Sequence, residues 1–269
     1  MLKSDDTGDR LEIVCEQREM KKALRAIASA TRSAVEARLF SEYGAVFVTT
    51  ATPPPNIVFA DSSEVEAFQS TLSIQYARIG DYEISLQSEA MDALARAVAE
   101  MQDRKGRIAA RAADSGGRSY EETVGLWLRN VTRGLERYES EGRVSSERAQ
   151  RIRELAPVDQ IALILEMEDQ EHIFFGTFFD RSILYSVAAP GASQHLSLLA
   201  FDVDEYQNEE VAKALNLHGW FRTVPNDLPH FTFLGHAEKS LPEMGLIRIE
   251  REYNQQSYGF WVPDLDSLL

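Results

Sequence analysis

The chain has 269 residues, of which 44% are hydrophobic and 26% are charged, so it can bury a core and is neither disordered nor collagen-like. Its 28 basic and 43 acidic residues give a net charge of −15, which argues against a nucleic-acid partner because phosphate binding needs clustered Lys and Arg. The single cysteine, Cys15, excludes an intramolecular disulfide framework and Cys-rich zinc motifs. Any metal ion must therefore be held by His and carboxylate side chains.

Targeting signals and common enzyme motifs are absent from the sequence. No run approaches the 18 or so apolar residues of a transmembrane helix, and no basic start followed by an apolar stretch marks a secretory signal. The compartment stays open: periplasm or cell envelope if a signal has been removed, cytoplasm otherwise. The sequence also lacks a P-loop, a Gly-x-Gly-x-x-Gly fingerprint, a His-Glu-x-x-His motif and a Gly-x-Ser-x-Gly elbow.

The N-terminal two thirds of the chain are predicted to be mainly helical. Apolar residues at helical spacing predict one long helix or two short ones over 11–39, and Met91, Leu94, Val98 and Met101 predict an amphipathic helix over 88–104. Further helices are expected over 63–69, 119–139, 146–155 and 157–168, and short strands over 44–49, 57–60 and 107–113.

From residue 173 onward, short β-like runs alternate with turns. Strands are expected over 183–187, 198–203, 231–234, 246–249 and 258–262. Helices followed by strands favour an α+β fold over a doubly wound sheet. The acidic stretch around 204–210 is expected to be a solvated loop, and Trp127 and Trp220 are expected to anchor the core.

Two of the five histidines lie in informative surroundings. His195 follows the turn Pro190-Gly191 and precedes Asp202, at the end of an apolar strand, by seven residues. Seven is an odd interval, so strand alternation would put the two side chains on opposite faces unless the chain bends near His195. His230 begins an aromatic strand, three residues after Asp227.

Two imidazoles and one carboxylate, His195, His230 and Asp202, match a catalytic zinc site, which keeps a fourth position open for water. The alternative is two histidines at the edge of the core and an ordinary Asp at a strand end. His172, His218 and His236 are interpreted as structural or surface residues.

These motifs resemble the zinc D-alanyl-D-alanine carboxypeptidases, the vancomycin-resistance type within the hedgehog and lysostaphin metallopeptidase fold. Pro190-Gly-x-Ser-x-His195 with Leu-Ala-x-Asp202 is similar to the family's first ligand motif, and Asp227-Leu-Pro-His230 to its Glu-x-Trp-His motif. Residues 114–122 resemble its Ser-Gly-Tyr-Arg-Ser-Tyr-Glu segment. The resemblance covers about residues 85–236.

The resemblance implies that His195, Asp202 and His230 bind Zn²⁺ and that Asp227 acts as the general base. It also implies that Arg118 clamps a substrate carboxylate, because a guanidinium binds a carboxylate bidentately. The residues expected to bind substrate or to support Arg118 are Ser193, Ser119 and Tyr120.

Each of these side chains also has a structural explanation. Asp227 could belong to a turn before Pro229, and Arg118 could be a solvated residue at the start of a helix. Ser193 could cap the Pro-Gly turn and Ser119 could be a helix N-cap.

The sequence departs from the family at two positions. Leu198 stands where the family has Gly, so a left-handed backbone there would cost roughly 1–2 kcal/mol. Asp227 replaces Glu and is one methylene shorter.

The resemblance implies a small antiparallel sheet carrying the metal site, flanked by helices. The N-terminal extension would cover 1–84 and the catalytic domain 85–269, with a helical insertion over about 120–175. The expected activity is zinc-dependent hydrolysis of the C-terminal D-Ala-D-Ala bond of a peptidoglycan stem peptide, or of a small D-amino-acid peptide. The alternative is a non-catalytic cell-wall or protein-binding member of the same fold. The sequence leaves the oligomeric state open.

Overall fold

The computed structural model describes residues 6–31 and 33–268. The α-helices are α1 (Asp6–Ala30), α2 (Ala34–Tyr43), α3 (Ser62–Gln69), α4 (Ser88–Asp103), α5 (Tyr120–Ser140), α6 (Ser146–Glu154), α7 (Pro157–Glu171), α8 (Glu209–Leu217) and α9 (Leu265–Leu268). The 3-10 helices are η1 (Gly44–Val48), η2 (Ile183–Tyr185), η3 (Gln194–Ser197) and η4 (Glu238–Met244). No helix in this part of the chain is long and apolar enough to cross a membrane.

The strands form three small antiparallel sheets. Their bounds are β1 (Ile74–Ile79), β2 (Tyr82–Gln87), β3 (Ala200–Asp202), β4 (Trp220–Phe221), β5 (His230–Phe233), β6 (Leu246–Tyr253) and β7 (Gln256–Pro263). β1 pairs with β2 and β6 with β7, while the middle sheet has the order β3-β5-β4. This mixture of helices and small antiparallel sheets agrees with the predicted α+β class.

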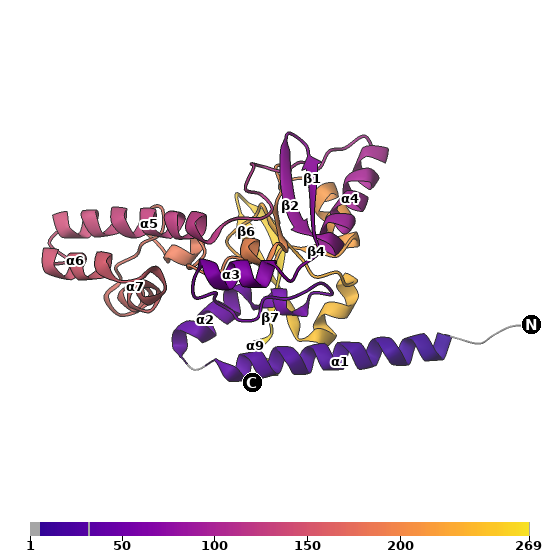
Figure 1. Ribbon diagram of the computed structural model, residues 1–269, viewed down its shortest axis with the longest axis horizontal. Helices are drawn as coiled ribbons and strands as arrows, with labels where there is room; N and C mark the ends of the chain where they lie inside the picture. The colour runs from indigo at the N-terminus through magenta and orange to yellow at the C-terminus, as the bar shows by residue number, and fades with distance from the viewer. Residues whose placement is uncertain (1–5, 32, 269) are drawn as a thin grey trace, which may run out of the picture.

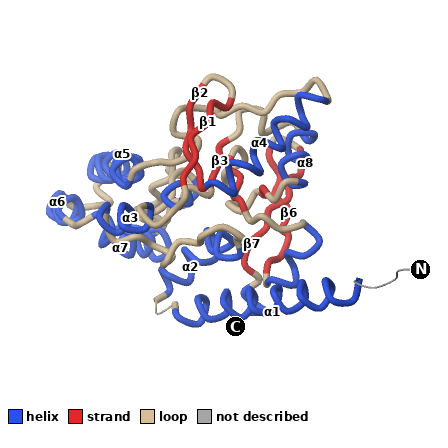
Figure 2. Tube along the Cα trace, turned by 45° about the vertical axis from the view of Figure 1, so that its right-hand side comes forward, coloured by secondary structure: helices blue, strands red, loops and turns tan. Residues whose placement is uncertain are grey.

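The molecule consists of a body and a helical arm (Figure 1). The body contains the three sheets with α4 and α8 beside them, and α1 runs along its base (Figures 1 and 2). Helices α5, α6 and α7 project to one side as the arm. The arm lies within the span of the insertion predicted over 120–175.

Each part has its own buried apolar cluster. The body cluster includes Trp220, Phe231 and Phe233 from the middle sheet. The arm cluster is built around Trp127, whose indole Nε1 donates to Gln160 Oε1 at 3.1 Å. Both tryptophans are fully buried, which confirms the prediction that they anchor the core.

The strongly periodic helices are confirmed, since α4, α5, α6 and α7 match the predicted ranges within a few residues. The region 11–39 forms two helices rather than one, and Ser33 caps the second by accepting from the Glu36 amide. Leu24 and Ala28 of α1 share the body cluster with Leu268 near the C-terminus. The boundary at residue 84 stays a prediction.

Four predicted strands are wrong. Residues 44–49 form η1, 183–187 contain η2, 57–60 lie in a bend without strand pairing, and 107–113 contribute one isolated bridge, between Ala110 and Val203. All five residues of η1 are buried. A short apolar run that is buried on every side does not distinguish a strand from a helix, which explains the error at η1.

The sequence analysis also missed regular elements. The β1-β2 hairpin turns at Gly80, whose φ of +68° suits glycine. Residues 209–217, of which only 209 and 210 belong to the predicted solvated loop, form α8, with Asn208 accepting from the Glu210 amide at its N-terminus. The acidic residues therefore occupy the first turn of a helix, where negative charge is favourable.

Candidate metal centre

His195 lies on η3, directly after a turn that fixes its position. Gly191 has a φ of +78°, and a Cβ there would overlap the Phe59 carbonyl oxygen. After η3, Leu198 has a φ of +57°, and this left-handed residue turns the chain into β3. The bend predicted near His195 is therefore present, and it brings His195 and Asp202 to the same side.

Strand pairing brings in the third side chain. In the β3-β5 register, Asp202 lies directly opposite His230. Asp202 Oδ1 is 3.4 Å from His195 Nε2 and 3.3 Å from His230 Nδ1. One ligand atom from each of the three residues lies within 4.8 Å of the other two. This spacing suits a single metal ion.

Hydrogen bonds on the outer nitrogens orient both imidazole rings. His195 Nδ1 lies 2.6 Å from the Gly116 carbonyl oxygen, and His230 Nε2 lies 2.8 Å from Gln194 Oε1. We assign the proton of each neutral ring to that outer nitrogen, because both partners accept hydrogen bonds. The inner nitrogens of both rings then present lone pairs toward Asp202 Oδ1, an arrangement typical of metal-ligating histidines.

Gln194 holds His230 and was missed in the sequence analysis. Its amide Nε2 donates to the Tyr43 carbonyl oxygen at 2.9 Å, which fixes the orientation of the amide. Its Oε1 is thus left to accept from the Thr232 hydroxyl as well as from His230. No motif singles out this glutamine beyond its position next to His195.

Asp202 needs a cation at its Oδ1 atom. Burial opposes its ionisation, and the pKa of Asp202 is held well below the ordinary range only where His195 and His230 are protonated and donate to it. Oδ1 is buried and forms no hydrogen bond with a residue that the structure describes. Either protonated imidazoles or a metal ion can meet this charge, and a metal ion is the cation that suits two neutral imidazoles.

Arg118 contacts the other oxygen of Asp202. Its Nη2 lies 3.4 Å from Asp202 Oδ2 and 3.1 Å from Asp114 Oδ2. The guanidinium therefore positions the candidate ligand Asp202 while also facing the cleft described next. Its expected role as a clamp for a substrate carboxylate stays a prediction.

A cleft of about 220 Å³, here called the metal cleft, opens beside these residues. It is lined by Tyr43, Arg118, Leu126, Leu184, Tyr185, Ser186, Val187, Ala188, Ser193, Gln194, His195, Val224, Asn226, Asp227 and His230. Ser193, Arg118 and Asp227 thus share one cleft with both histidines. Asp227 is accessible to solvent there, and desolvation by the surrounding protein, followed by the repulsion of Asp202, raises the pKa of Asp227.

Two predicted substrate-binding residues do not line this cleft. Ser119 forms a capping box with Glu122 at the start of α5, which is the structural role considered for it. The Tyr120 hydroxyl donates to the Ala60 carbonyl oxygen. Both residues follow Arg118 directly and fix the start of α5.

Two of the remaining histidines have structural roles. His172 ends α7 with a left-handed backbone, and His218 Nε2 lies 2.9 Å from Glu100 Oε2. Both positions agree with the structural or surface interpretation.

The chain matches no protein-family profile and no curated protein. A solved structure that resembles it is a mutant of VanY, a vancomycin-resistance D,D-pentapeptidase from a VanB-type resistance cassette, in complex with Zn(II). The two share 14% sequence identity over 65% of this chain and 86% of that chain, with a TM-score of 0.36. Similarity at this level carries no argument about the present chain, so the proposal below rests on the residues of the metal cleft.

Proposed function

We propose that this protein is a zinc-dependent peptidase that hydrolyses the C-terminal D-Ala-D-Ala bond, or a similar bond, of peptidoglycan stem peptides. One observation carries the proposal. Two imidazoles, each fixed through its outer nitrogen, direct their inner nitrogens at a buried carboxylate oxygen that has no hydrogen-bond partner.

The residues present fit a zinc ion. His195 Nε2, His230 Nδ1 and Asp202 Oδ1 would hold it, and three protein ligands with one open position are typical of catalytic rather than structural zinc. A zinc ion bound there would polarise the scissile carbonyl and acidify a water molecule.

Asp227 is the proposed general base. Its carboxylate lies in the same cleft as both histidines, and its raised pKa brings it closer to neutral pH, where proton transfer in both directions is efficient. We propose that Asp227 accepts the proton of the attacking water and delivers it to the nitrogen of the leaving amino acid.

The substrate class is inferred from the sequence motifs and from the charge of the metal cleft. Arg118 contributes a guanidinium to a wall that otherwise includes apolar side chains such as Leu126, Leu184 and Val187. A short peptide with a small apolar C-terminal residue and a free carboxylate is complementary to such a wall.

A specific observation supports the alternative, a non-catalytic binding protein. Asp114 and Asp202 both contact Nη2 of Arg118, so two carboxylates already neutralise the guanidinium expected to bind substrate. A chain that retains the metal centre and binds a peptide without cleaving it is compatible with this pairing.

Release of D-alanine from a pentapeptide ending in D-Ala-D-Ala tests the proposal. We expect the zinc-loaded protein to release D-alanine, chelation to abolish this activity, and added Zn²⁺ to restore it. The protein should not release L-alanine from a matched peptide ending in L-Ala-L-Ala. The His195→Ala variant is expected to be inactive, and His218→Gln, which removes a histidine outside the cleft, is expected to be active. A zinc-loaded protein that binds the pentapeptide without releasing D-alanine would contradict the catalytic proposal and favour the binding alternative.

A further inference from the structure

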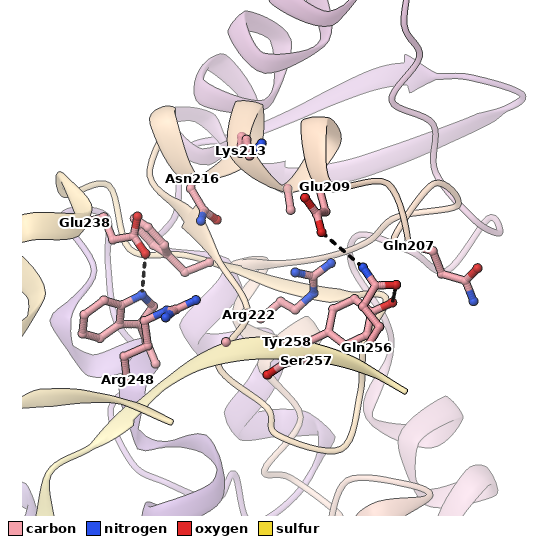
Figure 3. Close-up of a pocket in the computed structure, with 14 residues that line it drawn as sticks. Gln207, Glu209, Lys213, Asn216, Arg222, Glu238, Arg248, Gln256, Ser257 and Tyr258 are labelled. Atoms are coloured by element: carbon pink, nitrogen blue, oxygen red, sulfur yellow. Dashed lines mark hydrogen bonds between the residues drawn. The ribbon is translucent and has the colours of Figure 1, made fainter. Parts of the chain in front are cut away.

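A second cleft, of about 200 Å³, is bounded by α8, β4 and the β6-β7 hairpin (Figure 3). It shares no lining residue with the metal cleft. Side chains alternate along β5, so Phe231 points away from His230, and its ring lies against Arg222 of the second cleft. The two clefts are thus separated by the sheet.

Arg222 forms the floor of the second cleft. It is only 9% exposed, its Nε donates to the Leu228 carbonyl oxygen at 3.1 Å, and its Nη2 donates to that of Tyr206 at 2.6 Å. Its guanidinium also lies over the rings of Phe231 and Tyr258, at 4.6 and 5.3 Å from their centroids. These contacts fix the group within the cleft (Figure 3).

The charge of Arg222 has no carboxylate partner within the described part of the chain. Burial lowers the pKa of Arg222 to about 10, so the side chain remains charged at neutral pH. Carbonyl oxygens satisfy its donors but supply only partial negative charge, and a buried cation without a counter-ion is costly. An anionic group of a ligand would supply the missing counter-charge.

Two carboxylates at the rim of the second cleft carry negative charge that no ion pair with a described residue balances. Glu209 accepts a hydrogen bond from the Gln256 amide at 3.4 Å, and Glu238 accepts one from the Trp261 indole at 3.2 Å. Both donors are neutral, and neither glutamate forms an ion pair with a residue that the structure describes. The rim therefore offers negative charge to a cationic group.

The basic residues at the rim are already paired. Lys213 Nζ lies 2.8 Å from Glu210 Oε1, and Arg248 Nη1 lies 2.5 Å from Glu250 Oε1. Among the described residues, Arg222, Glu209 and Glu238 thus form no ion pair, although Lys213 also lies within electrostatic reach of Glu209. Glu209 is the carboxylate on the Arg222 side, because Gln256, which donates to it, accepts from the Tyr258 hydroxyl, and the Tyr258 ring lies beside the guanidinium. Glu238 lies at the other end, beside Trp261.

We propose that the second cleft binds a free amino acid, with its carboxylate at Arg222 and its ammonium group at the carboxylate of Glu209. Alanine, with six non-hydrogen atoms, is small enough to enter a cleft of about 200 Å³. The inference does not depend on peptidase activity, although the proposed reaction would release an amino acid of this class.

Calorimetric titration of the full chain tests the ligand class. D-alanine and L-alanine are compared with propionate, which lacks the ammonium group, and with ethylamine, which lacks the carboxylate. We expect at least one alanine enantiomer to bind with a Kd on the order of 1 mM, and both single-charge analogues to bind at least tenfold more weakly. Each titration is repeated after chelation, and unchanged binding then separates this site from the metal centre.

Variants at the rim locate the site without disturbing the buried arginine. The Glu209→Gln variant is expected to weaken alanine binding about tenfold, whereas the neighbouring Glu210→Gln variant, outside the cleft, should bind as the wild type does. Failure of both enantiomers to bind at about 50 mM, propionate binding as tightly as alanine, loss of binding on chelation, or unchanged binding by Glu209→Gln would each overturn the proposal.

Discussion

Asp227 is the residue on which the proposed chemistry depends most. The Asp227→Asn variant keeps the size of the side chain but cannot accept the proton of the attacking water. We therefore expect D-alanine release to fall by about 10²–10⁴-fold, the usual contribution of a general base. Zinc content should be unchanged, since Asp227 is not among the three candidate ligands.

The Asp227→Glu variant keeps a carboxylate at this position, as in the Glu-x-Trp-His motif that the sequence resembles. It should therefore retain measurable release of D-alanine. A wild-type rate in Asp227→Asn would exclude this residue as the base.

Leu198 carries a backbone strain that can be measured directly. Its φ is +57°, a conformation that costs a non-glycine residue roughly 1–2 kcal/mol, yet its buried side chain contributes more than that. Both Leu198→Ala and Leu198→Gly should lower the free energy of unfolding. We expect the glycine variant to be the more stable of the two by about 1 kcal/mol, the reverse of the order in an ordinary helix.

Denaturant unfolding of the two variants measures this difference. Ala95→Gly, in the middle of α4, is the matched control and should show the ordinary loss relative to its alanine parent. An alanine variant at 198 that is more stable than the glycine variant would contradict the account of this turn.

The site residues differ in how far the sequence could predict them. The sequence singled out His195, Asp202, His230 and Asp227 by their motifs, and the structure brings them to one cleft or next to it, while their roles stay predictions. Gln194 was not singled out, because its role requires Tyr43, Thr232 and His230, from three distant segments, to meet around one amide. Such a convergence is a property of the fold and leaves no local pattern.

At the scale of elements, α7 is tied to the chain that follows it through one buried carboxylate. Glu168 Oε1 accepts from the amides of Phe175 at 3.0 Å and Ile183 at 2.7 Å. Burial raises the pKa of Glu168 in spite of these bonds. The protonated form is thus favoured by folding, and its contribution to stability is full below the ordinary Glu pKa of about 4.3 and lost as pH rises through the folded value.

The Glu168→Gln variant removes this titration. The unfolding free energy of the wild type minus that of the variant should fall as pH rises from about 4.3, by at most about 1.4 kcal/mol per pH unit. Denaturant unfolding at several pH values measures the difference, and Glu166→Gln, at an exposed position of the same helix, is the control. A difference that is flat or that rises with pH would contradict the raised pKa.

The elements predicted correctly and those missed differ in their surroundings. α4 and α5 were predictable because one face is apolar and the other polar over four turns or more. η1 was assigned the wrong type because all of its residues are buried, so no alternation remains. The β1-β2 hairpin was missed although β2 alternates apolar and polar residues, at Tyr82, Ile84 and Leu86, after a turn at Gly80.

At the scale of the whole molecule, the metal cleft lies where the arm meets the body. Leu126 of α5 and the segment 184–188 that follows the arm form one side, and the histidines of the body form the other. The arm is therefore in a position to determine which ligands enter the cleft.

The central claim is that His195, Asp202 and His230 hold a zinc ion, and elemental analysis of the purified protein tests it most directly. We predict one zinc ion per chain in the wild type and in His218→Gln, and near-complete loss in His195→Ala and in His230→Ala. Zinc at full occupancy in both ligand variants, or a wild-type protein that takes up no zinc from a buffer containing it, would contradict the account.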